Sequence, residues 1–151
     1  MSLHQEITNG VKEALKSKDG RKLSVLRGLL SSCTNHLVAT GRKPNEILND
    51  NEVLTVIKKQ VKQRKDSIKQ YQDGNRPELA EAEQAEMAIL ETYLPEPIPD
   101  EKIEAIIKSK KEELGLKTKA DAGRLIGAVI KETNGQADGQ RVKTLIEKLL
   151  D

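Results

Sequence analysis

The sequence predicts an all-α protein of about seven helices, in two helical subdomains of roughly four and three helices. Its hydrophobic residues, 36% of the chain, are almost entirely aliphatic, and Tyr71 and Tyr93 are the only aromatic residues. Strands favour aromatic and β-branched side chains, so this composition argues against a sheet. Apolar residues also recur at helical spacing on both sides of a proline-rich segment, which marks the boundary between the subdomains.

Two helices are expected in the first 40 residues. Ser2 and Gln5 form a capping box, in which each side chain accepts a hydrogen bond from the other residue's backbone amide. Asp19 can cap the second helix, and Gly41 ends it because glycine readily adopts the left-handed conformation found after helices. The first helix carries an apolar stripe at every fourth position, formed by Leu3, Ile7, Val11 and Leu15.

The third and fourth helices complete the first subdomain. Asn49 and Glu52 form a second capping box, and the helix that they open ends at Asp73-Gly74. Pro77 suits the first turn of the fourth helix, where its missing N–H is not needed. Glu83 falls near the apolar face of that helix, where an ion pair to the preceding basic helix is preferred over a metal-ligand or acid–base role.

A short linker, residues 95–99, separates the subdomains of residues 1–94 and 100–151. Prolines at positions 95, 97 and 99 exclude a helix there and favour an extended, stiff segment.

Three helices are expected beyond the linker. Asp100 is expected to cap the first of them, and Gly115 to end it. Thr118 and Asp121 should open the second, which ends at 134–135, and Asp138 should cap the last.

Charge is unevenly distributed along the chain. Residues 1–75 hold 14 Lys and Arg against 8 Asp and Glu, a net of +6, whereas residues 76–100 hold one Arg against seven acids, a net of −6. Four lysines of the third helix follow one another at steps of four, three and four residues and share one face, the lysine row: Lys58, Lys62, Lys65 and Lys69. Such a row could bind nucleic-acid phosphates. The alternative is a solvated face that the acidic fourth helix partly neutralises.

Gly123 and Gly127 lie four residues apart in the sixth helix, where each costs about 1 kcal/mol relative to alanine. Close helix–helix packing is the preferred explanation. A ligand or phosphate lying against that face is the alternative.

The sequence carries no recognisable catalytic centre. His4 and His36 are isolated, Cys33 lies on the apolar stripe of its helix, and no zinc, phosphate-loop or nucleophile-elbow motif occurs. We therefore expect no catalytic residue, no cofactor and no metal site. A single cysteine suits a reducing compartment. With neither a signal-peptide pattern nor an apolar run long enough to span a membrane, a cytoplasmic location without membrane association is expected.

Two segments of the sequence carry distinctive motifs. The first runs from Tyr71 through Gly74-Asn75-Arg76-Pro77 and an Ala- and Glu-rich helix to Tyr93-Leu94-Pro95. The second holds Asp121-Ala122-Gly123-Arg124 and Gly135-Gln136-Ala137-Asp138-Gly139. Together they resemble the GatB/YqeY family, from whose DMGK-like motif the second segment differs at Ala122 and Arg124. The match spans nearly the whole chain, whose length resembles that of a free-standing, bacterial-type YqeY protein.

The resemblance implies an all-helical fold of two subdomains, related to the C-terminal tail of the B subunit of the tRNA-dependent amidotransferase. That tail helps to engage tRNA, while the catalytic centres of the enzyme lie in other domains. The implied function is a non-catalytic module that binds tRNA. The residues that would face RNA in the second subdomain are Gly123, Arg124, Gly127, Lys131, Gly135, Asp138 and Gly139.

Two other functions remain open. The chain could be a protein–protein adaptor that docks on a tRNA synthetase or amidotransferase, because its alternating charge blocks offer complementary surfaces. It could also be an enzyme of amide-nitrogen transfer, a carbon–nitrogen ligase with glutamine as amido-N-donor, by inheritance from the larger family member. That reading ranks last because the chain lacks a nucleophile–base pair.

Overall fold

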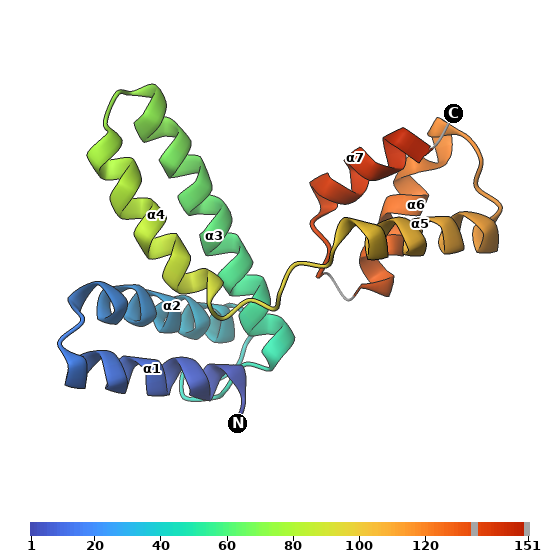
Figure 1. Cartoon of the computed structure of the whole chain (residues 1–151). Coiled ribbons are helices and arrows are strands. Elements are labelled where there is room, and N and C mark those ends of the chain that lie inside the picture. Colours follow the sequence, from blue (N-terminus) through green and yellow to red (C-terminus); the bar gives the residue numbers. More distant parts are fainter. Residues whose placement is uncertain (134–135, 150–151) are drawn as a thin grey trace. The chain divides into compact units, whose positions relative to one another are not determined.

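The computed structural model describes residues 1–133 and 136–149, and every regular element in them is helical (Figure 1). The predicted all-α fold is confirmed. Contacts divide the chain into two compact units, residues 1–94 (unit 1) and 95–151 (unit 2). The helices described are α1 (Leu3–Ser17), α2 (Gly20–Ala39), α3 (Asp50–Asp73), α4 (Pro77–Glu91), α5 (Asp100–Leu114), α6 (Ala122–Glu132) and α7 (Gly139–Leu149), with a 3-10 turn at Lys119–Asp121.

Unit 1 consists of two helical hairpins, α1–α2 and α3–α4, which meet at a shared aliphatic core (Figure 1). All four helices and the loop before α3 contribute to that core, through side chains that include Ile7, Leu26, Leu48, Ile57 and Leu90. The core contains no fully buried aromatic ring, so its stability depends on close packing of branched aliphatic side chains.

Unit 2 packs α5, α6 and α7 around a smaller aliphatic core. Ile107 of α5, Leu125 and Val129 of α6, and Val142 and Ile146 of α7 are fully buried in it. Residues 95–99, which precede α5, form no helix or strand.

Most helix ends lie where the local sequence places them. The capping boxes of Ser2 with Gln5 and of Asn49 with Glu52 both form. Gly41 follows α2 with a left-handed φ of 76°, and Pro77 is the first residue of α4. These ends depend on contacts within a few residues, which is why they can be read from sequence.

Three expectations about the helices need correction. Leu15 is 50% exposed, and Ala14 takes its place in the core. A step of four residues advances 40° beyond a full turn, so the third step after Leu3 has rotated away from the core. The capping box of Thr118 with Asp121 forms as predicted, but it opens a 3-10 turn, Lys119–Asp121, and the sixth helix itself begins at Ala122. The end predicted for it, residues 134–135, lies outside the described residues.

Asp100 does not cap α5. It is the first helical residue, and Pro99 before it offers no side-chain cap. The Asp100 carboxylate instead accepts two hydrogen bonds from the Arg141 guanidinium of α7, one of them 2.8 Å long. These bonds lower the pKa of Asp100. The sequence pattern thus predicts the start of α5 correctly, but the Asp100 side chain pairs with Arg141 of α7 and does not cap its own helix.

Glu52 links three parts of unit 1 at the start of α3. Its carboxylate accepts a pair of hydrogen bonds from Arg42 in the preceding loop and lies 3.3 Å from His36 Nε2 on α2. The hydrogen bonds from Arg42 are the main cause that lowers the pKa of Glu52 from 4.5 to about 2. Nearby, the Leu48 amide donates to His4 Nδ1, so both histidines contact the region where α3 begins.

Gly10 lets the side chains of Tyr93 and Leu26 approach the backbone of α1 closely, a contact that the sequence pattern does not predict. A Cβ at this position would lie 2.5 Å from the Tyr93 hydroxyl and 2.8 Å from Leu26 Cδ1. Both distances are shorter than real carbon contacts, so no larger residue fits without displacing a neighbour. Because Leu26 is fully buried, it has little room to move.

The substitution Gly10→Ala is therefore expected to destabilise unit 1 by about 1–3 kcal/mol despite the better helix propensity of alanine. Thermal unfolding followed by circular dichroism would measure it. Gly28→Ala in α2 is the matched control, since a Cβ there meets nothing within 4 Å and should raise the melting temperature. A Gly10→Ala protein as stable as wild type would contradict the packing argument.

Glu52→Gln is expected to lower the melting temperature near neutral pH, because it replaces the charged partner of Arg42. The folded-state pKa of Glu52 is depressed, so its contribution is present above its ordinary value of 4.5 and lost as pH falls toward 2. The difference in melting temperature between wild type and variant should therefore shrink between pH 5 and pH 2. Glu81→Gln, at an exposed position of α4, should show no such pH-dependent difference.

Candidate nucleic-acid interface

The acidic helix α4 is paired with one cation of α3. Arg64 Nη1 lies 3.2 Å from Glu83 Oε2 and also contacts the Glu86 carboxylate. All three side chains are less than one-third exposed. The predicted ion pair of Glu83 with the basic helix before it is confirmed. The Arg64 Nε atom beside these pairs is buried and has no hydrogen-bond partner among the described residues.

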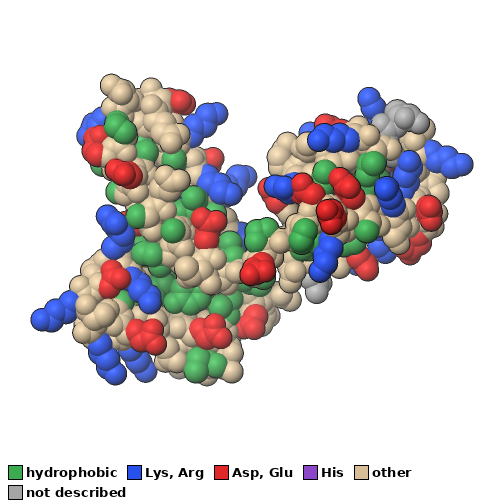
Figure 2. Space-filling model, viewed as in Figure 1, with side chains coloured by type: hydrophobic (Ala, Val, Ile, Leu, Met, Phe, Trp, Pro, Cys, Tyr) green, Lys and Arg blue, Asp and Glu red, His purple; other side chains and the backbone are tan. Residues whose placement is uncertain are grey.

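The lysine row lies on a different side of α3. Lys62, Lys65 and Lys69 are exposed, and no ion pair to any of them occurs in the described residues. Lys58, at the inner end of the row, is half-buried and interacts within the protein. Figure 2 shows Lys and Arg side chains projecting along the α3 side of the α3–α4 hairpin. The glutamates of α4 that pair with Arg64 thus leave the outer part of the row without an acidic partner.

Gly123 and Gly127 do not serve helix–helix packing, and that expectation is wrong. Both are exposed, and a Cβ at either position would meet nothing within 4 Å. The buried side of α6 is instead formed by Leu125 and Val129. At 100° per residue, the two glycines share an arc of about 100° with Arg124 and Lys131, which are also exposed. We call these four residues the α6 face.

The start of α7 has a local structural explanation. Asp138 Oδ1 accepts a hydrogen bond from the Gln140 amide at 3.1 Å, in agreement with the predicted cap. Gly139 is the first residue of α7, and a Cβ there would make an ordinary 3.6 Å contact with Ile130. Gly135, the other predicted RNA-facing residue of this segment, lies outside the described residues.

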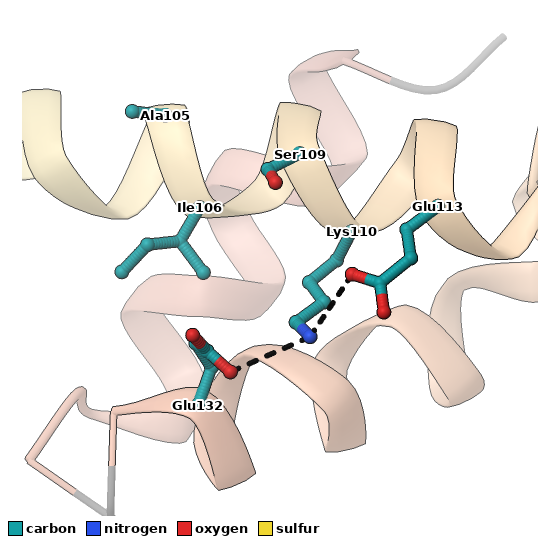
Figure 3. Close-up of a pocket in the computed structure, with 6 residues that line it drawn as sticks. All are labelled: Ala105, Ile106, Ser109, Lys110, Glu113 and Glu132. Carbon is teal, nitrogen blue, oxygen red and sulfur yellow. Dashed lines mark hydrogen bonds and ion pairs between the residues drawn. The ribbon is translucent and has the colours of Figure 1, made fainter.

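A shallow cleft of about 250 Å³ lies between α5 and α6 (Figure 3). Lys110 extends across it, with Nζ 3.2 Å from Glu113 Oε2 and 3.4 Å from Glu132 Oε2. The hydrogen bonds that Lys110 donates, first to Glu113 and then to Glu132, raise the pKa of Lys110. The charged groups that line the cleft therefore pair with one another, and the pair of Lys110 with Glu132 links α5 to α6.

A second cleft, of about 280 Å³, lies in unit 1 between α2 and α3. Gly28 forms one wall, and Gln60, Gln63 and Ser67 form the other, with Arg64 and Glu83 at its edge. Gln60 is already engaged, because its amide donates to Ser32 Oγ at 2.7 Å. The lining offers hydrogen bonds but brings together no nucleophile with a base.

The residues that could have carried chemistry are placed in structural roles. Burial raises the pKa of the Cys33 thiol to about 11, which disfavours the reactive thiolate at neutral pH. No group of three His, Cys, Asp or Glu side chains in the described residues is arranged to hold a metal ion. Among the same residues, no helix is both long and apolar enough to cross a bilayer.

Sequence reasoning missed a second basic region, at the turn that joins α1 to α2. Four exposed cations gather there: Lys12, Lys16, Lys18 and Arg21. We call this set the basic turn. Figure 2 shows Lys and Arg side chains at the lower left, where Figure 1 places the end of the α1–α2 hairpin. The net charge of +6 in residues 1–75 was the available signal, because the lysine row holds only four of the 14 cations of that segment.

A family model and the curated relatives of this chain indicate the same protein family. A model of the family described as "Yqey-like protein" matches residues 4–150. The chain is 27% identical over 143 residues to "Altered inheritance of mitochondria protein 41, mitochondrial" of Pyrenophora tritici-repentis, covering 93% of this chain and 76% of that protein. It is 30% identical to the proteins of the same name from Saccharomyces cerevisiae strain YJM789, over 89% of this chain and 69% of the relative, and from Clavispora lusitaniae, over 82% and 69%.

These relatives correct the expected cytoplasmic location, because their names describe mitochondrial proteins. They likewise do not support the expectation of a bacterial-type protein. The cysteine argument could not separate the alternatives, since it only distinguishes reducing from oxidising compartments. The family model and the relatives agree over nearly the whole length, and the chain belongs to the YqeY-like protein family.

Proposed function

We propose that this protein is a non-catalytic helical module that binds tRNA through charge. The observation that carries the proposal is the outer part of the lysine row. Lys62, Lys65 and Lys69 are exposed on one side of α3, and the described residues provide no acidic partner for them. Cations spaced along a helix can follow successive phosphates, and such contacts supply most of the sequence-independent affinity for nucleic acid.

The resemblance of the sequence to the tail of the tRNA-dependent amidotransferase B subunit supports tRNA as the form of RNA. The described residues also expose no aromatic platform on which single-stranded bases could stack, because both tyrosines are partly buried. Recognition by backbone charge and shape therefore suits this surface better than recognition of unpaired bases.

The α6 face is the second element of the proposal. Each glycine in it lowers helix stability, and in the described residues no packing contact compensates. A helix surface without side chains lets a phosphate backbone come close, while Arg124 and Lys131 lie beside it to supply charge. Two surfaces on two units would let the module contact more than one part of a folded RNA.

The adaptor function has weaker support. The large apolar side chains that are exposed in the described residues come from five different places: Met1 before α1, Leu15 on α1, Val38 on α2, Ile47 in a loop and Leu114 on α5. Apolar residues scattered in this way are common on protein surfaces and do not mark a docking site. Capture of a tRNA synthetase or amidotransferase after nuclease treatment would favour the adaptor instead.

The lysine row is tested by changing Lys62, Lys65 and Lys69 to Gln and measuring tRNA binding across a salt series. We expect log affinity to fall linearly with log salt for wild type, and the slope to decrease in magnitude by roughly 0.7–0.9 for each lost phosphate contact. The matched control removes three exposed lysines of unit 2, Lys102, Lys108 and Lys117. Equal slopes for wild type and the α3 variant would remove the row from the interface, and absence of binding at low salt would reject the function.

The α6 face is tested by the double substitution Gly123→Ala and Gly127→Ala. We expect it to stabilise unit 2, by up to about 1 kcal/mol per glycine, because the added methyl groups meet nothing. We also expect weaker tRNA binding, because they occupy the space that the RNA backbone would use. A variant with a higher melting temperature and unchanged affinity would show that RNA does not approach this face.

A further inference from the structure

The basic turn is a dense cluster of cations outside the surfaces already assigned. Lys12 and Lys16 lie one turn apart on α1, on the side opposite the buried Ile7 and Ala14. Lys18 lies in the connection, and Arg21 lies in the first turn of α2. All four side chains are exposed. The hairpin therefore presents positive charge on its outer side and around its end.

Neither acid of this segment, Glu13 or Asp19, forms an ion pair in the described residues. Asp19 caps α2, where its Oδ1 accepts a hydrogen bond from the Lys22 amide at 3.1 Å. Glu13 is exposed on α1, and its charge adds to burial, the main cause, in raising the pKa of the Tyr93 hydroxyl. No ion pair involving Lys12, Lys16, Lys18 or Arg21 occurs in the residues that the structure describes.

Lys18 holds a backbone conformation that lysine rarely adopts. It ends α1 with φ 57° and ψ 34°, in the left-handed region, where glycine is usual after a helix. Other residues are strained there because Cβ approaches the following carbonyl. Lys18 thus occupies a position where glycine would be less strained, and it places a positive charge at the end of the α1–α2 hairpin.

The partner that fits this surface is a polyanion with its charges spread in three dimensions. An anionic bilayer would need a broad apolar face beside the cations. The turn offers only one exposed large apolar side chain, Leu15. Phosphates of a folded nucleic acid need no apolar contact, and they can meet cations on more than one side of a helical hairpin.

We propose that the basic turn is a second phosphate-binding surface of unit 1, which contacts the RNA backbone independently of the lysine row. This inference rests on the proposed function, since it takes the polyanion to be tRNA. It adds that the α1–α2 hairpin contributes phosphate contacts of its own, and that Lys18 retains its strained position because of the charge that it supplies.

The test uses the full chain and purified tRNA across a salt series. One variant combines Lys12→Gln, Lys16→Gln, Lys18→Gly and Arg21→Gln, and its matched control changes four exposed lysines of unit 2 to Gln: Lys102, Lys108, Lys117 and Lys143. We expect the first variant to lower the magnitude of the salt slope by roughly 0.7–0.9 per lost contact, and the control to leave it near the wild-type value. Circular dichroism verifies that both variants are folded.

The single variant Lys18→Gly separates binding from folding. Glycine relieves the left-handed strain, so we expect a higher melting temperature together with weaker tRNA binding. If wild type binds tRNA and only the lysine-row variant changes the salt slope, the inference about the basic turn is overturned while the proposed function stands. If wild type does not bind tRNA at low salt, both are overturned. If the fourfold basic-turn variant loses the binding of wild type to phosphatidylserine–phosphatidylcholine vesicles while its tRNA binding is unchanged, the basic turn is a membrane-binding surface and the inference is overturned.

Discussion

The contact between Arg64 and two carboxylates of α4 holds the part of unit 1 that extends beyond its core. The buried residues of α3 end at Val61, and Ala80 is the one buried residue described in the outer half of the α3–α4 hairpin. The remaining length of the two helices is joined by Arg64 with Glu83 and Glu86, and by partly buried side chains. The positions of Lys65 and Lys69 depend on this arm, so the candidate RNA surface is organised by a partly buried charge cluster as well as by aliphatic packing.

Helix ends and fold class could be predicted from the sequence because they depend on neighbouring residues. A capping box or a proline in a first turn acts within one helical turn, and these signals placed α1, α3 and α4 correctly. Long-range contacts could not be predicted in the same way. Gly10 packs under Tyr93, some 80 positions away in the chain, and Asp100 pairs with Arg141 from another helix. Both have the sequence appearance of ordinary helix residues.

The candidate site shows the same division. Helical spacing was sufficient to place the lysine row on one face, and the acidic residues of α4 were correctly expected to pair with α3. Arg64, the cation with which they pair, lies at least 100° around the helix from each lysine of the row, on the side that faces α4. For the glycines of α6 the spacing was right and the explanation was wrong, because Leu125 and Val129 form the buried side of the helix and the glycines lie away from it. The left-handed Lys18 gives no sequence signal at all.

The location of Cys33 has a practical consequence for experiments on this chain. It is the single cysteine of the sequence and is fully buried in unit 1, which also contains both tyrosines. A thiol reagent can reach it only when unit 1 opens, so the rate of labelling reports the opening of that core. Tyrosine fluorescence also arises from residues 1–94 alone, whereas the helices of both units contribute to circular dichroism. Unfolding curves from the two signals would therefore coincide only if the units melt together, and a difference between them would measure the stability of unit 2 without a label.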